Sequence, residues 1–352
     1  MNNISSRILL YPEAIQEAIS QEMEHDSKVI IFGLDVDDPK SILGTTKNLL
    51  NKYGADRVFG TPLSEEAMTG AAVGMALAGL KPIHVHMRMD FLMLAMNQII
   101  NVAAKTHYMS GGQEYVPMVI RSIIGKSWGQ GAQHSQALYS FFMHVPGLKV
   151  VAPSTPYDAK GCMIAAIRDN NPIMYVEHRH LYYQKGFVKS DLYSVKPGKA
   201  RVITEGNNIT IVGISNMVVE SIKAQKYLQD IGISAEVIDP IWLSPLDLDT
   251  IETSVKKTKN LLVVDNGWTM CGAGSEIIAS ITERLQTLNH LKVKRIGFAP
   301  TPCPTTPSLE KFFYPNALSI ASSANDLLNK VDKGWVPKER EDLKDIEFKG
   351  PF

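Results

Sequence analysis

The sequence predicts an α/β protein of two domains, each built on a parallel sheet. Short apolar runs alternate with helical segments along the chain, which is typical of parallel sheets covered on both faces. The alternation stops between residues 182 and 200, where Gly186, Pro197 and Gly198 interrupt the periodicity. The chain has 352 residues and 45% of them are hydrophobic, so each half can bury a core of its own.

The first half opens with a helix over residues 11–26, in which Ile15, Ile19 and Met23 recur at helical spacing. Pro12 stands near its start, where a missing N–H costs little. The other elements expected in this half are a strand at 29–32, helices at 42–53, 67–80 and 91–102 (the last one buried), and strands at 57–59, 118–121, 149–151 and 174–177.

The second half repeats the alternation without a detectable sequence repeat. Strands are expected at 209–212, 235–238, 261–264 and 293–297, with helices at 217–231, 246–258 and 272–287. We therefore expect a first domain at 1–186, a linker at 187–204, a second domain at 205–330 and a charged tail at 331–352. The tail is either a solvated end or an arm that binds a partner subunit.

Composition excludes several classes of protein. Lys+Arg and Asp+Glu both number 36, so the chain lacks the basic surplus of a nucleic-acid binder. Three scattered cysteines form no disulfide or zinc pattern, and we expect a reducing cytoplasm. No apolar run is long enough to cross a membrane.

A few polar residues are candidates for chemistry. Glu65 follows Pro62 and opens the helix of small residues, where an acid can also simply satisfy backbone donors. His134 lies in a glycine-rich loop and could exchange protons. His84, His86 and Arg88 alternate, so they are expected to share one side of a strand, as a solvated or subunit-interface face or as an anion site.

Longer motifs carry a family resemblance that covers nearly the whole chain. They are RVFGTPLSE (57–65), GAAVGMALAGLKP (70–82), YMSGGQ (108–113), GAQHSQ (131–136) and HVPGLKVVAPSTPYDAK (144–160). In this order they resemble the beta subunit of thiamine-diphosphate-dependent 2-oxo acid dehydrogenases, the decarboxylating component. The implied domains are a pyrimidine-binding domain and a transketolase C-terminal domain.

The resemblance implies an α2β2 heterotetramer that binds thiamine diphosphate between subunits, with magnesium held mainly by the alpha subunit. It implies decarboxylation of a 2-oxo acid and transfer of the acyl unit, in some members to a lipoyl-bearing acyltransferase. Glu65 matches the carboxyl group that hydrogen-bonds the pyrimidine ring of the cofactor, and Leu63, Met87 and Phe91 match residues that line that ring. His134 matches a histidine that positions substrate or assists acyl transfer.

Family members also often bind potassium through backbone carbonyls. The matching positions are Met118, Ala166, Asp169 and Asn171. An ordinary strand–loop packing motif is the alternative, because carbonyl ligands leave little trace in the choice of side chain.

The sequence departs from the family at several positions. Leu34 and Val85 stand where members usually carry acids. Basic groups are added at His86, Arg88, His178, Arg179 and His180. The added basic groups suit an alternative activity, a split transketolase-like or acyloin-forming enzyme that transfers a ketol or acyl unit to a sugar or aldehyde acceptor.

Overall fold

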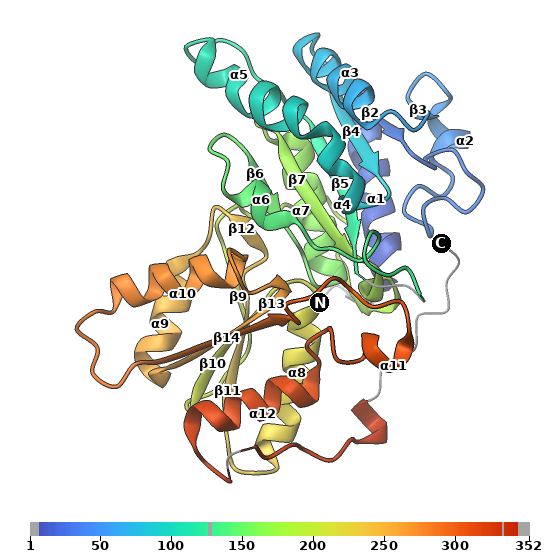
Figure 1. The fold of residues 1–352 in the computed structure, drawn as a ribbon. Coiled ribbons are helices and arrows are strands. Elements are labelled where there is room, and N and C mark those ends of the chain that lie inside the picture. The colour runs from blue at the N-terminus through green and yellow to red at the C-terminus, as the bar shows by residue number, and fades with distance from the viewer. Residues whose placement is uncertain (1–6, 126–128, 333, 344–352) are drawn as a thin grey trace, which may run out of the picture. The chain divides into compact units, whose positions relative to one another are not determined.

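A computed structural model describes residues 7–125, 129–332 and 334–343 of the chain. Its contacts divide the chain into two compact units (Figure 1). The first unit comprises 1–125 and 141–197, and the second comprises 126–140 and 198–352. The expected domain boundaries are close to this division, except that residues 126–140 belong to the second unit.

The first unit is built on a parallel sheet with strand order β6-β7-β5-β4-β2-β3. Neighbouring strands are in parallel register, as in the pairs Ile31↔Ile83 and Ile83↔Val119. The strands are β2 (Val29–Gly33), β3 (Val58–Gly60), β4 (Lys81–His86), β5 (Val119–Ile124), β6 (Lys149–Val151) and β7 (Ile173–His178). The predicted parallel α/β class is confirmed for this unit.

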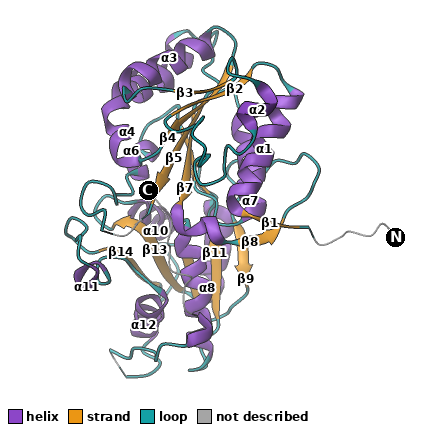
Figure 2. Ribbon diagram, turned by 90° about the vertical axis from the view of Figure 1, so that its right-hand side faces the viewer, coloured by secondary structure: helices purple, strands orange, loops and turns teal. Residues whose placement is uncertain are grey.

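Helices cover both faces of this sheet. In Figure 2, α1 (Tyr11–His25) and α7 (Pro156–Arg168) lie on one face and α3 (Glu65–Leu77) on the other. The periodic residues Ile15, Ile19 and Met23 of α1 are buried, as their spacing predicts.

Two expected helices differ from the prediction. Only α2 (Leu49–Tyr53) forms within 42–53, because Ile42, Leu43 and Asn48 adopt positive φ, which breaks a right-handed helix. The segment expected as a buried helix at 91–102 is an irregular helical stretch with an exposed side. It comprises α4 (Met89–Leu92), the 3₁₀ turn η1 (Met93–Ala95), the π-helix η2 (Asn97–Ala103) and α5 (Ala104–Met109).

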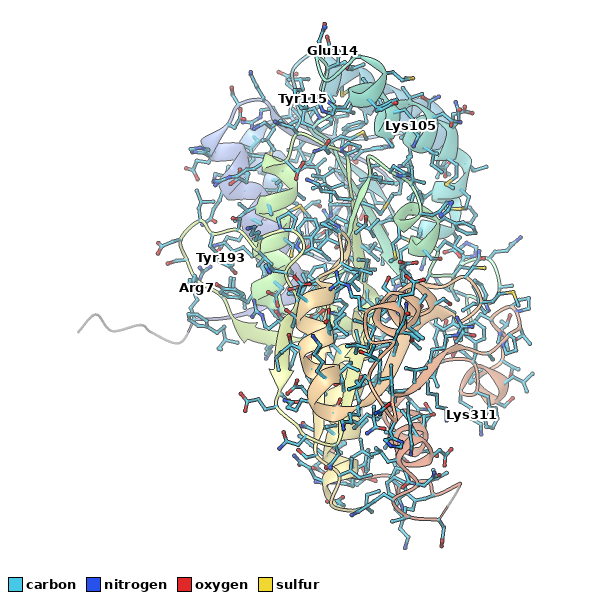
Figure 3. All side chains as sticks on the ribbon, turned by 90° about the vertical axis from the view of Figure 1, so that its left-hand side faces the viewer. Arg7, Lys105, Glu114, Tyr115, Tyr193 and Lys311 are labelled. Atoms are coloured by element: carbon cyan, nitrogen blue, oxygen red, sulfur yellow. The ribbon has the colours of Figure 1, made fainter. Side chains whose placement is uncertain are left out.

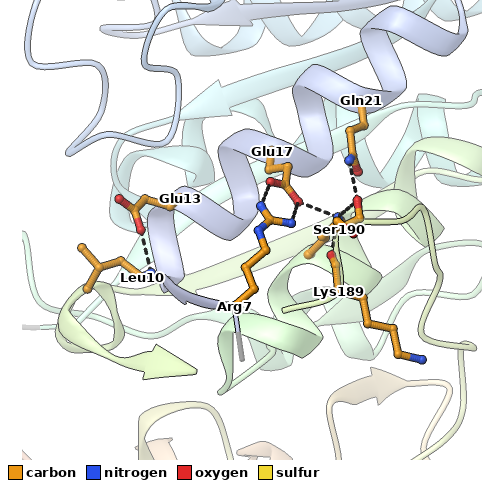
Figure 4. Close-up of polar contacts among 8 residues, drawn as sticks. Arg7, Leu10, Glu13, Glu17, Gln21, Lys189 and Ser190 are labelled. Carbon is orange, nitrogen blue, oxygen red and sulfur yellow. Dashed lines mark hydrogen bonds and ion pairs between the residues drawn. The ribbon is translucent and has the colours of Figure 1, made fainter. Parts of the chain in front are cut away.

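A small antiparallel pair closes the first unit near its N-terminal end. β1 (Ile8–Leu10) pairs with β8 (Lys185–Phe187), and Arg7 and Glu17 form an ion pair beside it (Figure 4). Farther along the same segment, the ring of Tyr193 stacks on Tyr157 with 4.5 Å between centroids (Figure 3). The region expected as a linker is therefore bound to α1 and α7 over much of its length.

The second unit has a sheet of order β14-β13-β10-β11-β9. Its strands are β9 (Arg201–Thr204), β10 (Ile209–Gly213), β11 (Ala235–Asp239), β13 (Asn260–Trp268) and β14 (Lys292–Phe298). All pairs are parallel except β9 with β11. Residues 201–204, expected in the linker, thus form an antiparallel edge strand of this sheet.

Helices also flank the second sheet. α8 (Asn216–Gln229) packs with α12 (Ala317–Leu328), and α9 (Leu248–Thr258) packs with α10 (Ala273–Arg284). Shorter elements of this unit are β12 (Trp242–Ser244), α11 (Pro307–Glu310) and the 3₁₀ turn η4 (Glu341–Leu343). The 3₁₀ turn η3 (Arg179–Tyr183) belongs to the first unit, and α6 (Tyr139–Met143) lies at the boundary of the two units in the sequence.

The described part of the charged tail packs on its own unit. Leu343 joins the core around α8 and α12, Trp335 packs against that core, and the Arg340 N–H donates to the Tyr227 hydroxyl at 3.1 Å. Most residues of 334–343 are nevertheless exposed, as a solvated end would be, and residues 344–352 of the predicted tail lie outside the described residues. The three cysteines are free, and among the described residues no helix is long and apolar enough to cross a membrane.

Candidate active site

The carboxyl edge of the first sheet gathers the residues expected to contact a cofactor. After β2 the chain adds β3 on one side and β4 on the other, which makes the ends of these strands a topological switch point. Ligands of open parallel sheets bind at such an edge. Leu63 and Glu65 follow β3, while Met87 and Phe91 follow β4, so all four lie at this edge.

Glu65 is the first residue of α3, directly after Ser64, which makes no side-chain cap. One turn later, the buried Thr69 hydroxyl lies 3.2 Å from His86 Nε2, at the end of β4. This contact ties the start of α3 to the residue that precedes Met87. It fixes the separation between the carboxyl of Glu65 and the side chains that follow β4.

The three side chains expected to line the cofactor ring are apolar and accessible. Leu63 is 78% exposed and Phe91 is 37% exposed, and Met87 is half-buried. The apolar side chains of Phe91, Met87 and Leu63 suit the faces and edges of a planar heteroaromatic ring, and the carboxyl group of Glu65 suits a basic nitrogen of that ring. The residues present therefore fit the aminopyrimidine of thiamine diphosphate.

His134 lies in the second unit, on the loop that precedes α6. At one end of that loop Gly131 has φ +62° and lies against Thr305, whose Oγ1 would be 2.6 Å from an added Cβ. At the other end Tyr139 donates a hydrogen bond to Asp265 Oδ1, and the Asn266 N–H donates to the Tyr139 oxygen at 3.2 Å. The motif around His134 does not predict this anchoring of the loop, because nothing in it relates residue 139 to residue 265.

Tyr139 and Asp265 are both buried, and each affects the ionisation of the other. Burial raises the pKa of Asp265, although hydrogen bonds from Tyr139 and Gly274 act in the opposite direction. Burial and the nearby Asp265 raise the pKa of Tyr139 well above its usual value. The phenol therefore remains a proton donor to Asp265 at neutral pH.

His84 and His86 do not form the solvated face or the anion site that their alternation suggested. Both are 2% exposed; His84 stacks on Phe32 at 4.6 Å, and His86 meets His84 edge-on at 4.3 Å. Burial lowers the pKa of His84 to about 4 and that of His86 well below its usual value. Both imidazoles are neutral at pH 7, so neither is a cation for an anionic ligand.

A second feature that the sequence did not predict is the ion pair inside the first sheet. Arg121 on β5 donates to both carboxylate oxygens of Glu177 on β7, at 2.7 and 2.9 Å, and both side chains are fully buried. The Tyr182 hydroxyl adds a third hydrogen bond to Glu177 at 2.8 Å. The pair fixes the carboxyl ends of β5 and β7 relative to each other.

The four residues expected at a potassium site lie near the opposite edge of this sheet, before β5 and β7 and at the end of α7. The Met118 carbonyl accepts from Ile173 N–H at 3.0 Å, and the Ala166 carbonyl accepts from Asp169 N–H at 3.4 Å. Asn171 donates to Asp169 Oδ1 through its N–H at 2.9 Å and its amide at 3.0 Å. Among the described residues, no group of three His, Cys, Asp or Glu could hold a metal ion.

Comparison with known proteins agrees with this fold. Residues 9–185 match the family model "Transketolase, pyrimidine binding domain" and residues 198–320 match "Transketolase, C-terminal domain". The fold is also similar to a solved structure described as a split gene transketolase, inactive beta4 tetramer. That likeness has a TM-score of 0.74 at 20% identity and covers 91% of this chain and 99% of the other. The chain is thus a protein of two transketolase-type domains.

Similar proteins of assigned function identify a narrower family within this class. The chain is 42% identical over 321 residues to the beta subunit of acetoin:2,6-dichlorophenolindophenol oxidoreductase of Cupriavidus necator, covering 88% of this chain and 95% of the relative. It is 39% identical to the protein of the same name in Bacillus subtilis, covering 92% and 98%. It is 40% identical to the pyruvate dehydrogenase E1 component subunit beta of Rickettsia bellii, covering 91% and 97%. The chain belongs to the family of beta subunits of thiamine-diphosphate-dependent 2-oxo acid dehydrogenases.

Proposed function

We propose that this beta subunit, together with an alpha subunit, decarboxylates a 2-oxo acid and transfers the acyl unit. The observation that carries the proposal is the placement of Glu65 at the head of α3, beside Leu63, Met87 and Phe91. When bound, thiamine diphosphate supplies a nucleophilic carbon for the 2-oxo group and accepts the electrons that carbon dioxide leaves behind.

Each residue at the edge has a role in this proposal. Glu65 hydrogen-bonds the ring nitrogen of the pyrimidine and shares a proton with it. Phe91 stacks on the ring, while Leu63 and Met87 fill the space beside it and exclude water. His134, on its anchored loop, positions the substrate or assists acyl transfer to the acceptor.

Large exposed apolar side chains support a partner subunit. In the first unit Leu94, Tyr108 and Met109 are 61%, 88% and 68% exposed. Several large apolar side chains exposed on one helical stretch are consistent with a protein interface. We propose an α2β2 heterotetramer in the cytoplasm, in which the alpha subunit holds magnesium and an acyltransferase with a lipoyl group takes the product.

Potassium at the edge formed by Met118, Ala166, Asp169 and Asn171 is part of the same proposal. Their position near the starts of β5 and β7 supports it, because carbonyl oxygens are suitable ligands for a hard cation. Dialysis against sodium should then lower the thermal stability of the protein, and return of potassium should restore it.

A second candidate function is favoured by the two relatives named for acetoin. Acetoin is an acyloin, and its cleavage or formation uses the same cofactor chemistry without a carboxylate leaving group. The residues proposed to hold the cofactor serve either reaction, and the two reactions differ in the substrate that is cleaved.

The decisive experiment uses the chain co-purified with its alpha partner and supplied with thiamine diphosphate and magnesium. It measures the carbon dioxide that this complex releases from each of a panel of 2-oxo acids. Glu65→Gln should lower turnover by roughly a hundredfold or more with assembly intact. Glu66→Gln is the matched control, because Glu66 is exposed in the same helical turn. Absence of carbon dioxide from every acid, with cleavage of acyloins instead, would establish the second candidate.

A further inference from the structure

The loop that carries His134 is anchored at a second place, close to His134 itself. Within the second unit, this loop packs against the segment 303–305, which follows β14. Gly131 has φ +62°, and a Cβ added to it would lie 2.6 Å from Thr305 Oγ1 and 3.9 Å from the Cys303 carbonyl oxygen. A Cβ added to Gly129, which has φ +63°, would lie 3.7 Å from the Thr305 methyl group. The loop and the segment are therefore in direct contact, and glycine at 129 and 131 allows this approach.

Tyr314 connects the segment to the loop through its hydroxyl group. Cys303 Sγ lies 3.4 Å from the Tyr314 hydroxyl oxygen, and the thiol donates to the Pro304 carbonyl at 3.6 Å. Burial and the neighbouring Cys303 raise the pKa of Tyr314, whereas the nearby Ser135 hydroxyl lowers it. The phenol therefore has both Cys303 and the buried Ser135 as neighbours, and it remains a proton donor at neutral pH.

The ring of Tyr314 belongs to an aromatic cluster at the ends of two strands. Its centroid lies 5.0 Å from that of Phe298 and 4.9 Å from that of Phe313, and both contacts are edge to face. Phe298 ends β14, and Trp268, which ends β13, contacts both phenylalanines at 5.7 and 6.3 Å. The Ala299 N–H donates to the Phe313 carbonyl at 2.9 Å. These contacts fix the ring, so its hydroxyl has a defined position relative to the sheet.

The contact with Tyr314 acts on the residue next to His134. The chain is held before His134 by the approach of Gly131 to Thr305, and directly after it at Ser135. The His134 side chain itself is half-buried. Because its backbone is fixed on both sides, the imidazole has few positions available to it.

We propose that Tyr314 is a positioning residue for His134, which it holds through Ser135 with Cys303 as its second partner. The inference rests on the proposed function, because it takes His134 to act on the substrate or on the acyl unit. A displacement of a reacting group by about 1 Å can lower a rate about a hundredfold. The Tyr314 hydroxyl therefore contributes to turnover without contacting the substrate or the cofactor.

The test makes two measurements on the full chain, co-purified with its alpha partner. Hydrogen exchange in peptides from residues 129–138 reports the order of the loop, and kcat/KM for the preferred 2-oxo acid reports catalysis. Tyr314→Phe keeps the aromatic ring and removes the hydroxyl. It should speed exchange in the loop about fivefold or more and lower kcat/KM about tenfold or more.

Tyr227→Phe is the matched control for Tyr314→Phe. Tyr227 is a buried tyrosine of the same unit, and its hydroxyl accepts a hydrogen bond from the Arg340 N–H at 3.1 Å. The substitution removes one hydroxyl contact of the second unit, as Tyr314→Phe does. It should change neither the exchange of the loop nor kcat/KM.

Substitutions of the two partners give measurements that do not depend on the folding of Tyr314→Phe. Cys303→Ser keeps a hydrogen-bonding group beside the phenol and should retain most of the activity, whereas Cys303→Ala should lower kcat/KM severalfold. Ser135→Ala should lower kcat/KM about as much as Tyr314→Phe. Combined with Tyr314→Phe it should add little, because the two groups act through one contact.

Unchanged exchange of the loop in Tyr314→Phe overturns the inference, and so does faster exchange with unchanged kcat/KM. Failure of the proposed function gives a different result, because the unmodified complex then releases no carbon dioxide from any 2-oxo acid. In that case kcat/KM is measured for the cleavage of an acyloin, and the comparison of variants is the same. Release by the unmodified complex that Tyr314→Phe leaves unchanged contradicts only the positioning role.

Discussion

Lys160 Nζ lies 2.6 Å from Glu17 Oε1, joining α7 to α1. The ammonium is fully buried and also donates to the carbonyls of Lys189 and Ser190, at 2.8 and 3.0 Å. Figure 4 shows that Glu17 also binds Arg7 and that the segment at Ser190 is held by Gln21. One buried cation therefore binds two helices and the segment that leads to the second unit.

Glu17→Gln should destabilise the first unit by about 3 kcal/mol, because it leaves the buried Lys160 charge without a counter-ion. Denaturant unfolding of the chain measures this change. Glu24→Gln is the control, since its pair with Lys52 is 3.3 Å long and exposed and is worth less than about 1 kcal/mol. Equal effects of the two substitutions would show that Lys160 is satisfied by the carbonyls alone.

Acid should destabilise the first unit through His84. Its folded pKa is about 4, whereas the unfolded value is about 6.5, so the unfolded chain binds the proton first as pH falls. Stability is unaffected above pH 6.5 and decreases by up to about 1.4 kcal/mol per pH unit between 6.5 and 4.

His84→Phe should reduce the slope of this part of the pH profile, because the stacking on Phe32 is kept and one of the two buried imidazoles, His84 and His86, is removed. Unfolding free energies at pH 7, 6 and 5 compare the two proteins. His290→Phe, at an exposed position of the second unit, is the control and should leave the slope unchanged. A slope as steep in His84→Phe as in the unmodified protein would assign the acid sensitivity to other groups.

The sequence predicts the features that depend on local pattern. Short apolar runs in the sequence predict strands such as β2 and β10, and the periodic apolar residues of α1 predict which face of this helix is buried. Glu65, Leu63, Met87 and Phe91 are found through motifs, and strand topology brings them to one edge. What pattern cannot reveal is long-range pairing of polar groups, as in Arg121 with Glu177 or Tyr139 with Asp265. Pattern also cannot distinguish alternating histidines that face water from alternating histidines that are buried. For this reason the expectation of an exposed face or an anion site at His84 and His86 is wrong.

Thr69→Val should weaken cofactor binding without removing any residue that contacts the cofactor. The substitution keeps the shape of the side chain but deletes the hydroxyl that contacts His86, so α3 and the end of β4 lose their polar connection. We expect about 1–2 kcal/mol lower stability and a several-fold weaker affinity for thiamine diphosphate, measured by calorimetry on the complex.

Thr210→Val is the matched control for this experiment. Thr210 is a buried threonine of the second unit that contacts Ser254 and Thr258, both at 2.7 Å. It should show a similar loss of stability with unchanged cofactor affinity. If both variants bind the cofactor equally well, the Thr69–His86 contact supports the fold but not the site.

Tyr139→Phe tests whether the anchored loop matters for catalysis. The variant removes the donor to buried Asp265 at the end of the loop that carries His134, and should cost about 1.5–3 kcal/mol of stability. If His134 acts on the substrate, kcat/KM for the 2-oxo acid should fall about tenfold or more, because small displacements of a reacting group are costly. Thiamine diphosphate affinity should not change, since Glu65, Met87 and Phe91 belong to the first unit.

Tyr115→Phe, at an exposed position where the ring stacks on His107, should alter none of these quantities. A loss of stability with unchanged kcat/KM would restrict Tyr139 and Asp265 to a structural role and remove the main support for His134 as a catalytic residue.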